Sequence, residues 1–151
     1  GGVLTAGPHR LGAAGAAGIP QVVSAGALDM VNFGAPDTVP EKSRDRLFYR
    51  HNPMVTLMRT TAEENATLGR ILADKLGRAT GPTVFMIPKG GVSSIDMPGK
   101  PFHDPEADAA LFDAFRANGP ANVEVVESAA DINDPAFATA AAERLLGLLK
   151  R

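Results

Sequence analysis

The residues best suited to bind a ligand follow a short apolar run at residues 83–87. The segment KGGVS, residues 89–93, comes next, and its glycine amides could approach phosphate or carboxylate oxygens while Lys89 adds positive charge. The spacing GxxxxGK(S/T) is absent, so this is not a Walker A loop. Two interpretations stay open: an anion-binding loop, or a tight turn that needs the conformational freedom of glycine.

A second group of polar residues surrounds the segment that leads into a predicted helix. His51 and Asn52 precede this segment, and Arg59 and Thr60 end it, just before Thr61. Free amides and the helix dipole favour anions at a helix start, and Arg59 could hold an oxyanion with two hydrogen bonds. In the alternative, His51 only ends a strand, Arg59 is solvated and Thr61 is only a helix cap.

Carboxylates and a histidine form a third set of candidates. Asp29 and Asn32 lie in one predicted loop, and Asp96, His103 and Asp104 lie in another. Carboxylates brought together could hold Mg²⁺ with substrate phosphates, or shift each other's pKa for acid–base work. Asp104 has a simpler explanation as the cap of the helix that follows.

Composition excludes several classes of protein. The chain has 151 residues, a formal charge of −2, no cysteine, and aromatic residues at 5%, so a basic nucleic-acid surface, a disulfide framework and a stacking platform are not predicted. Neither a GxSxG nucleophile elbow nor a GxGxxG motif occurs, and the three histidines are far apart. We therefore expect a soluble, cytoplasmic protein with no nucleic-acid or membrane partner. The sequence begins with Gly1 and not with an initiator methionine, so we expect this chain to be a piece of a longer one.

The elements that must position these residues alternate between strands and helices. Apolar patterns, caps and breakers predict strands at 19–24, 46–51, 83–87 and 123–126, and helices at 8–17, from Thr61 to Leu76, from Asp104 to 115 and from 134 to the end. This order predicts an α/β fold with a mainly parallel sheet and crossover helices, a Rossmann-like three-layer arrangement over residues 1–151.

The long connections indicate where a ligand would bind. Residues 26–44, 51–60 and 88–103 each follow a predicted strand, and strand-to-helix connections gather at the carboxyl edge of a parallel sheet. Residues 26–44 are expected to form a packed loop without regular structure, and residues 54–60 have no clear assignment. The candidate ligand site is therefore expected at this edge.

Several motifs occur in a fixed order along the chain. They are ALDMVNFG (27–34), HNP (51–53), LMRTT (57–61), PKGGVS (88–93), DMPGKPF (96–102) and DPEAD (104–108). In these motifs the chain resembles the carboxy-terminal domain of an uncharacterised family named after a tomato mosaic virus resistance protein. The resemblance implies two α/β domains and dimers, with ATP binding assigned to an amino-terminal partner domain that this chain lacks. ATP with Mg²⁺ is the candidate cofactor. Many relatives are expected to carry an acidic residue where this chain has Lys89.

Two main hypotheses follow. In the preferred one, the chain forms one wall of an interdomain cleft for a nucleotide (ATP) or another anionic small molecule. The candidate site residues are Asp29, Asn32, His51, Asn52, Arg59, Thr60, Gly90, Gly91, Ser93 and Asp96. In the rival one, the chain is an interaction or oligomerisation module anchored by Met30, Val31, Phe33 and Met54. A third, weaker hypothesis is a Mg²⁺-dependent enzyme acting on a phosphate or carboxylate ester, with Asp29 and Asp96 as ligands.

Overall fold

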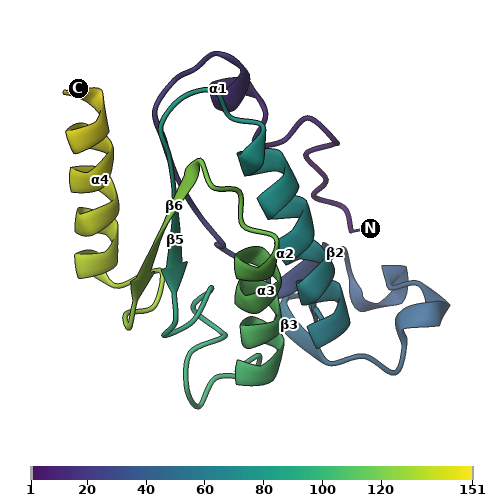
Figure 1. The fold of residues 1–151 in the computed structure, drawn as a ribbon. Coiled ribbons are helices and arrows are strands. Elements are labelled where there is room, and N and C mark those ends of the chain that lie inside the picture. The colour runs from purple at the N-terminus through teal and green to yellow at the C-terminus, as the bar shows by residue number, and fades with distance from the viewer. Residues whose placement is uncertain (1, 151) are drawn as a thin grey trace.

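A parallel sheet between two layers of helices forms the body of the molecule (Figure 1). The computed structural model describes residues 2–150. Its parallel strands lie in the order β1-β5-β6; α2 and α3 cover one face and α4 covers the other. The elements are α1 (Ala13–Ala16), β1 (Gln21–Ser24), α2 (Ala62–Gly77), β5 (Thr83–Pro88), α3 (Pro105–Ala117), β6 (Val123–Ser128) and α4 (Pro135–Leu149). The predicted α/β fold is confirmed.

The central strand β5 is buried on both faces, which explains its continuous apolar sequence. Phe85 and Ile87 belong to the core beneath α2 and α3, where the ring of Phe85 lies 4.1 Å from that of Phe115, centroid to centroid. Val84 and Met86 alternate with them and belong to the core beneath α4. Each such side chain contributes about 1.5–3 kcal/mol to folding. Strand β5 therefore holds the two cores together.

The helices begin where their caps predict. Thr61 and Glu64 form a capping box at the start of α2. Asp104 and Asp134 accept hydrogen bonds from the first turns of α3 and α4, each followed by proline. The helix predicted at residues 8–17 is wrong in extent, since only α1 is helical and the preceding turn contains Leu11 with a left-handed φ of 67°.

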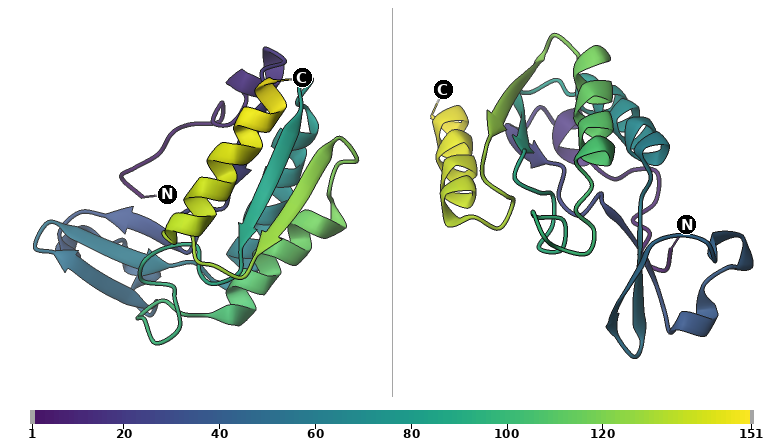
Figure 2. Two further views of the ribbon diagram at one scale, coloured as in Figure 1. Left: turned by 90° about the vertical axis from the view of Figure 1, so that its left-hand side faces the viewer. Right: turned by 90° about the horizontal axis from the view of Figure 1, so that it is seen from below.

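A second, antiparallel sheet was not predicted. It contains β2 (Met30–Phe33), β3 (Phe48–Asn52) and β4 (Val55–Arg59) in the order β2-β4-β3, with the short helices η1 (Pro36–Thr38) and η2 (Glu41–Ser43) between β2 and β3. The whole sheet is inserted between β1 and α2, and it projects from the three-layer body at the end away from α4 (Figure 2).

The second sheet corrects three expectations. Residues 26–44 are not a structureless packed loop, because they contain β2, and residues 54–60 contain β4. The strand predicted at 46–51 pairs with β4 instead of joining the parallel sheet. Residues 51–60 are therefore a hairpin turn and a strand, not a strand-to-helix connection. Strand β4 shows no alternation because four of its five residues are buried.

Gly69 is expected to be essential for the packing of α2 on α3. A β-carbon at Gly69 would lie 2.3 Å from the carbonyl oxygen of Leu111, whereas one at Gly147, on α4, would meet nothing within 4 Å. We expect Gly69→Ala to lower the free energy of unfolding by about 1–3 kcal/mol through overpacking. Gly147→Ala should raise it by up to about 1 kcal/mol, because alanine favours helix.

Urea unfolding of the two glycine variants tests this contact. Equal effects of Gly69→Ala and Gly147→Ala on the unfolding midpoint would contradict the close approach of α2 and α3.

Candidate functional site

The side chain of Arg59, at the end of β4, occupies the centre of a buried polar network. Only 4% of it is exposed. Its Nε donates to the carbonyl oxygen of Phe102 at 2.9 Å, and its Nη2 donates to Asp96 at 3.1 Å and Asp108 at 2.8 Å. Longer bonds run from Nη1 to the hydroxyl of Thr60 and from Nη2 to the carbonyl oxygen of Asp104. The guanidinium therefore joins β4 to the loop after β5 and to α3.

A second part of the network joins Asp29 to the same loop. The hydroxyl of Ser93 donates to Asp29 Oδ2 at 2.6 Å. The backbone amide of Thr60 donates to the carbonyl oxygen of Asp29 at 3.0 Å. The Thr60 hydroxyl donates to Leu28 and accepts from Asn65, on α2. Residues just before β2 and just after β4 thus meet residues of α2 and of the loop after β5 in one buried cluster.

The cluster contains more carboxylates than cations. Asp29 and Asp96 are fully buried and Asp108 is 13% exposed, against the single guanidinium of Arg59. Burial raises the pKa of Asp29, and Oδ1 of this residue has no hydrogen-bond partner among residues 2–150. Burial, assisted by the negative charge of Asp96, raises the pKa of Asp108 to about 7 despite the hydrogen bond from Arg59. Burial therefore favours the protonated forms of Asp29 and Asp108.

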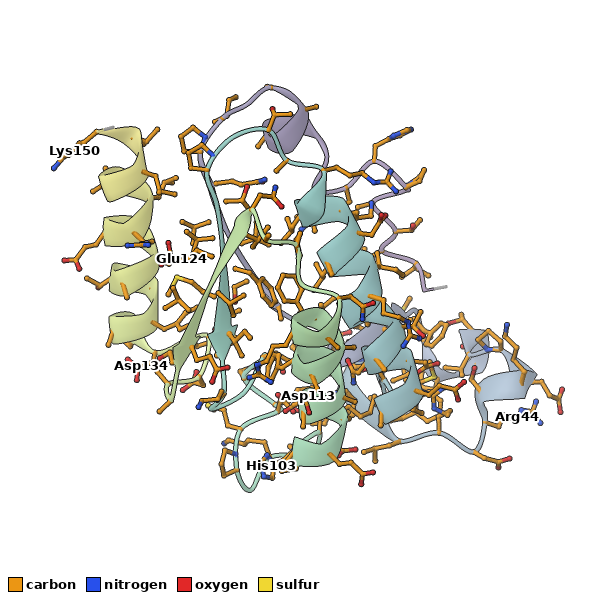
Figure 3. All side chains as sticks on the ribbon, in the orientation of Figure 1. Arg44, His103, Asp113, Glu124, Asp134 and Lys150 are labelled. Carbon is orange, nitrogen blue, oxygen red and sulfur yellow. The ribbon has the colours of Figure 1, made fainter. Side chains whose placement is uncertain are left out.

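Asp108 also lines an open cleft of about 240 Å³ at the carboxyl end of β5. Lys89, His103 and Arg116 contribute to the same cleft. In Figure 3, His103 and Asp113 mark its position at the start of α3 and further along the helix. The Nδ1 of His103 lies 3.0 Å from the carbonyl oxygen of Asp96. The cleft thus combines cations, a carboxyl group that titrates near neutrality and an imidazole.

The two cations of the cleft share one partner. Lys89 Nζ lies 3.1 Å from a carboxylate oxygen of Glu127, and the guanidinium of Arg116 pairs with the other oxygen. These pairs are partly exposed, and solvent-exposed ion pairs add little to stability. The pairing of Glu127 with both cations lowers its pKa. Another anion could therefore compete with Glu127 at little cost.

The backbone amides of the Gly-Gly loop are bonded within the protein. The amide of Gly90 donates to Ala130 at 3.1 Å, and the amide of Gly91 donates to Pro88 at 3.2 Å. A β-carbon at Gly90 would lie 2.6 Å from the amide nitrogen of Asp131, and Gly91 has a φ of 137°. Close packing and a tight turn account for both glycines, so their amides are not presented to a phosphate.

The structure brings most of the predicted site residues together. The buried cluster contains Asp29, Arg59, Thr60, Ser93 and Asp96. Gly90, Gly91 and Asp96 line the cleft.

Three predicted site residues lie elsewhere. Asn32 is on β2, where its carbonyl oxygen accepts from Val3. His51 and Asn52 are exposed on the β3–β4 hairpin, and the Asn52 side chain accepts from the amide of Met54 in the turn. Arg59 fits neither of its two predicted roles: its donors are directed at protein acceptors, so it is not a free clamp for an oxyanion, and its side chain is buried, so it is not solvated.

Sequence reasoning missed several residues of the site. Asp108 lies four residues after Asp104, so helical spacing places both on one side of α3, and this spacing was a usable signal. Asn65 is a buried polar residue within the apolar pattern of α2, which was a usable signal. Arg116, on the last turn of α3, gave no signal.

The anchors of the interaction hypothesis and the proposed metal ligands are also placed. Met30 and Val31 are half-buried, Phe33 is buried, and Met54 is 69% exposed. Within residues 2–150, no group of three or more His, Cys, Asp or Glu side chains is arranged to hold a metal ion. In the same part of the chain, no helix is long and apolar enough to cross a membrane.

Comparison with known proteins gives one family. Residues 1–149 match the model described as "Uncharacterised protein family (UPF0261) C-terminal domain". A UPF0261 protein of Clostridium tetani is 49% identical over 152 aligned residues, covering all of this chain and 38% of that protein. One from Rhizobium meliloti is 52% identical over 143 residues, covering 93% and 36%. The tomato ToMV resistance protein Tm-1(GCR237) is 39% identical over 150 residues, covering 97% and 20%. The chain thus spans roughly a third of the bacterial relatives and a fifth of the tomato protein.

The titration of Asp108 is expected to make stability depend on pH. Its pKa is 3.8 in the unfolded reference and about 7 in the folded protein, so between these values the folded state holds the extra proton. The free energy of unfolding should therefore fall as pH rises from 4 to 7. In Asp108→Asn we expect the fall in the free energy of unfolding between pH 4 and pH 7 to be smaller by about 1–3 kcal/mol. Asparagine stays neutral over this range, and its Oδ1 can still accept a hydrogen bond from Arg59.

Urea unfolding from pH 4.5 to pH 8 measures this effect. Asp113→Asn is the matched control, because Asp113 lies on the same helix with its side chain 71% exposed. An identical pH dependence in the wild type and in Asp108→Asn would contradict the assignment.

Proposed function

This chain belongs to the uncharacterised protein family UPF0261 as its C-terminal domain, and we propose that it binds a small anionic molecule in the cleft at the carboxyl edge of its parallel sheet. A nucleotide, ATP in particular, is the first candidate ligand. The cleft follows the central strand β5, the position at which open α/β sheets bind their ligands. The single observation that supports the proposal is that Lys89 and Arg116, which both line the cleft, pair with the same carboxylate, that of Glu127.

The two cations provide a place for a negative group. Lys89 and Arg116 both reach Glu127, so their charges lie on one side of the cleft. Because arginine binds planar oxyanions with two hydrogen bonds and lysine adds a point charge, the pair suits a phosphate or a carboxylate. The ligand group would take the place of Glu127 as the partner of one or both cations.

Asp108, eight residues before Arg116 on α3, gives the cleft a different property. Below pH 7 its carboxyl group is largely protonated, and a neutral carboxylic acid can donate a hydrogen bond. Arg59 holds it from the protein side at 2.8 Å. In this proposal the protonated Asp108 donates a hydrogen bond to an oxygen of the ligand. The ligand would also compete with Asp113, which lines the cleft and pairs with Arg116.

The remaining sequence of the family proteins would complete the site. A cleft of about 240 Å³ is smaller than the pockets of roughly 300–1,000 Å³ that enclose small ligands. The bacterial relatives are more than twice as long as this chain. We propose that their additional domain supplies the facing wall, and that a nucleotide would bring Mg²⁺ bound to its own phosphates. Assembly into a homo-oligomer stays part of this proposal.

A second candidate function is an interaction module. Met54 is 69% exposed at the tip of the β3–β4 hairpin, on the sheet that projects from the body of the molecule (Figure 2). Methionine is enriched at protein interfaces. Among the four anchor residues of this hypothesis, Met54 is the one that its exposure favours as an interface residue. Phe33, by contrast, is buried within the protein.

Charge reversal in the cleft tests the proposed function. We expect Lys89→Glu/Arg116→Glu to weaken binding of ATP with Mg²⁺ at least tenfold, about 1.4 kcal/mol, because two attractive charges become repulsive. Titration calorimetry on this chain and on a full-length family member carrying it measures the affinity. Arg44→Glu is the control, since Arg44 is an exposed residue just after η2. Equal affinity of the cleft variant and the control would reject the proposal.

A further inference from the structure

Three adjoining hollows meet at Arg10, at the opposite edge of the parallel sheet from the cleft. One of about 480 Å³ is lined by Arg10, Lys75 and Arg78, and one of about 530 Å³ by His9 and Arg10. The third, of about 430 Å³, also includes Arg10 and Lys75. These residues lie around α1 and the end of α2, at the top of Figure 1, whereas the cleft lies beyond the lower end of β5.

All ionisable residues that line these hollows are basic or neutral. They are His9, Arg10, Lys75 and Arg78, and no carboxylate of residues 2–150 lines any of the three. The chain as a whole has a formal charge of −2, so the cations are concentrated here against the overall balance. Such a concentration attracts anions.

The cations are held in place by the fold. Lys75 Nζ donates to the carbonyl oxygens of Pro8 at 2.5 Å and Arg10 at 2.8 Å, which fixes the turn against α2. An ammonium group has three donors, so one of them can still bind a ligand. Arg78 is oriented by three hydrogen bonds to Asp74, at 2.7, 2.9 and 3.3 Å, which form an exposed ion pair.

The dipole of α2 does not explain why all of these cations lie together around the hollows. Basic residues in a last turn are stabilised by the carbonyl end of a helix, which explains Lys75 and Arg78. Arg10 belongs to a different segment, before α1, and forms no ion pair within residues 2–150. The neighbouring Leu11 adopts a left-handed φ of 67°, a conformation that costs energy for a branched residue.

The third hollow adds an apolar surface to the cations. It runs from Arg10 and Lys75 along α2 towards β2. Its apolar lining includes Leu4, Leu11, Leu28, Met30, Val31, Leu68, Ile71 and Leu72. At its rim Leu4 is 77% exposed and Ile71 is 43% exposed. A ligand with one anionic end and an apolar body matches the charge at one end of this groove and the apolar surface along it.

We propose that this groove is a second binding site, for a small amphipathic anion. The phosphate or carboxylate of the ligand lies between Arg10 and Lys75, and its apolar part lies along Leu28, Met30 and Leu68. The cationic end of the groove is at the opposite edge of the sheet from the cleft, and the groove shares no lining residue with the cleft, so the proposal does not depend on the proposed function.

Hexyl phosphate and inorganic phosphate are suitable probes. Amide ¹H–¹⁵N spectra of this chain, titrated with each, locate and measure binding. We expect hexyl phosphate to shift residues 8–12 and 68–78 and to bind at least tenfold more tightly than inorganic phosphate, because only it fills the apolar groove. Shifts confined to residues 89–116, no binding of hexyl phosphate at millimolar concentration, or equal affinities of the two probes would overturn the proposal.

Three charge reversals assign the site to its residues. We expect Arg10→Glu to weaken hexyl phosphate at least tenfold, whereas Arg70→Glu, on α2 outside the hollows, and Arg116→Glu, in the cleft, stay within twofold of the wild type. Arg10 is exposed, so this variant should keep the wild-type urea midpoint. An unchanged affinity in Arg10→Glu would overturn the proposal, and a loss in Arg116→Glu alone would assign the binding to the cleft instead.

Discussion

The buried guanidinium of Arg59 is the interaction on which the arrangement of this molecule depends. Removing a charge from water costs several kcal/mol, and the cost is offset only where every donor finds a partner. Each of the three guanidinium nitrogens of Arg59 has at least one protein acceptor, and most of these acceptors come from the loop after β5 and from α3. Through Arg59, the antiparallel sheet is therefore hydrogen-bonded to α3 and to the loop after β5. The same hydrogen bonds fix the position of this loop, which lines the cleft.

The same network determines the chemistry that the cleft presents. Asp96 takes hydrogen bonds from Arg59 and from the amide of Val92, so both of its oxygens are satisfied inside the protein. Asp108 shares the guanidinium and also lines the cleft, and burial beside the negative charge of Asp96 raises its pKa to about 7. The guanidinium of Arg59 thus binds two carboxyl groups with different properties. Asp96 has both oxygens hydrogen-bonded within the protein, whereas Asp108 can exchange a proton near neutral pH.

Local signals in the sequence predicted the parallel part of the fold. The apolar run of β5 and the caps at Thr61, Asp104 and Asp134 act within a few residues, so they can be recognised without the structure. The antiparallel sheet could not be recognised, because β2 has four residues and β4 is buried on both faces, which hides the alternation of a strand. The residue types around Arg59 were recognised, but its burial depends on Phe102 and Asp108, more than 40 residues away. Only the fold brings these residues together.

A double-mutant cycle between Arg59 and Asp96 tests the central role of this ion pair most directly. The free energy of unfolding would be measured in urea for the wild type, Arg59→Met, Asp96→Asn and the double variant. Arg59→Met should cost about 3–5 kcal/mol, because it leaves buried carboxylates without their cation. Adding Asp96→Asn should then cost little, giving a coupling energy above about 2 kcal/mol. Single effects that add to within about 0.5 kcal/mol would contradict the account, since Arg59 and Asp96 would then contribute independently.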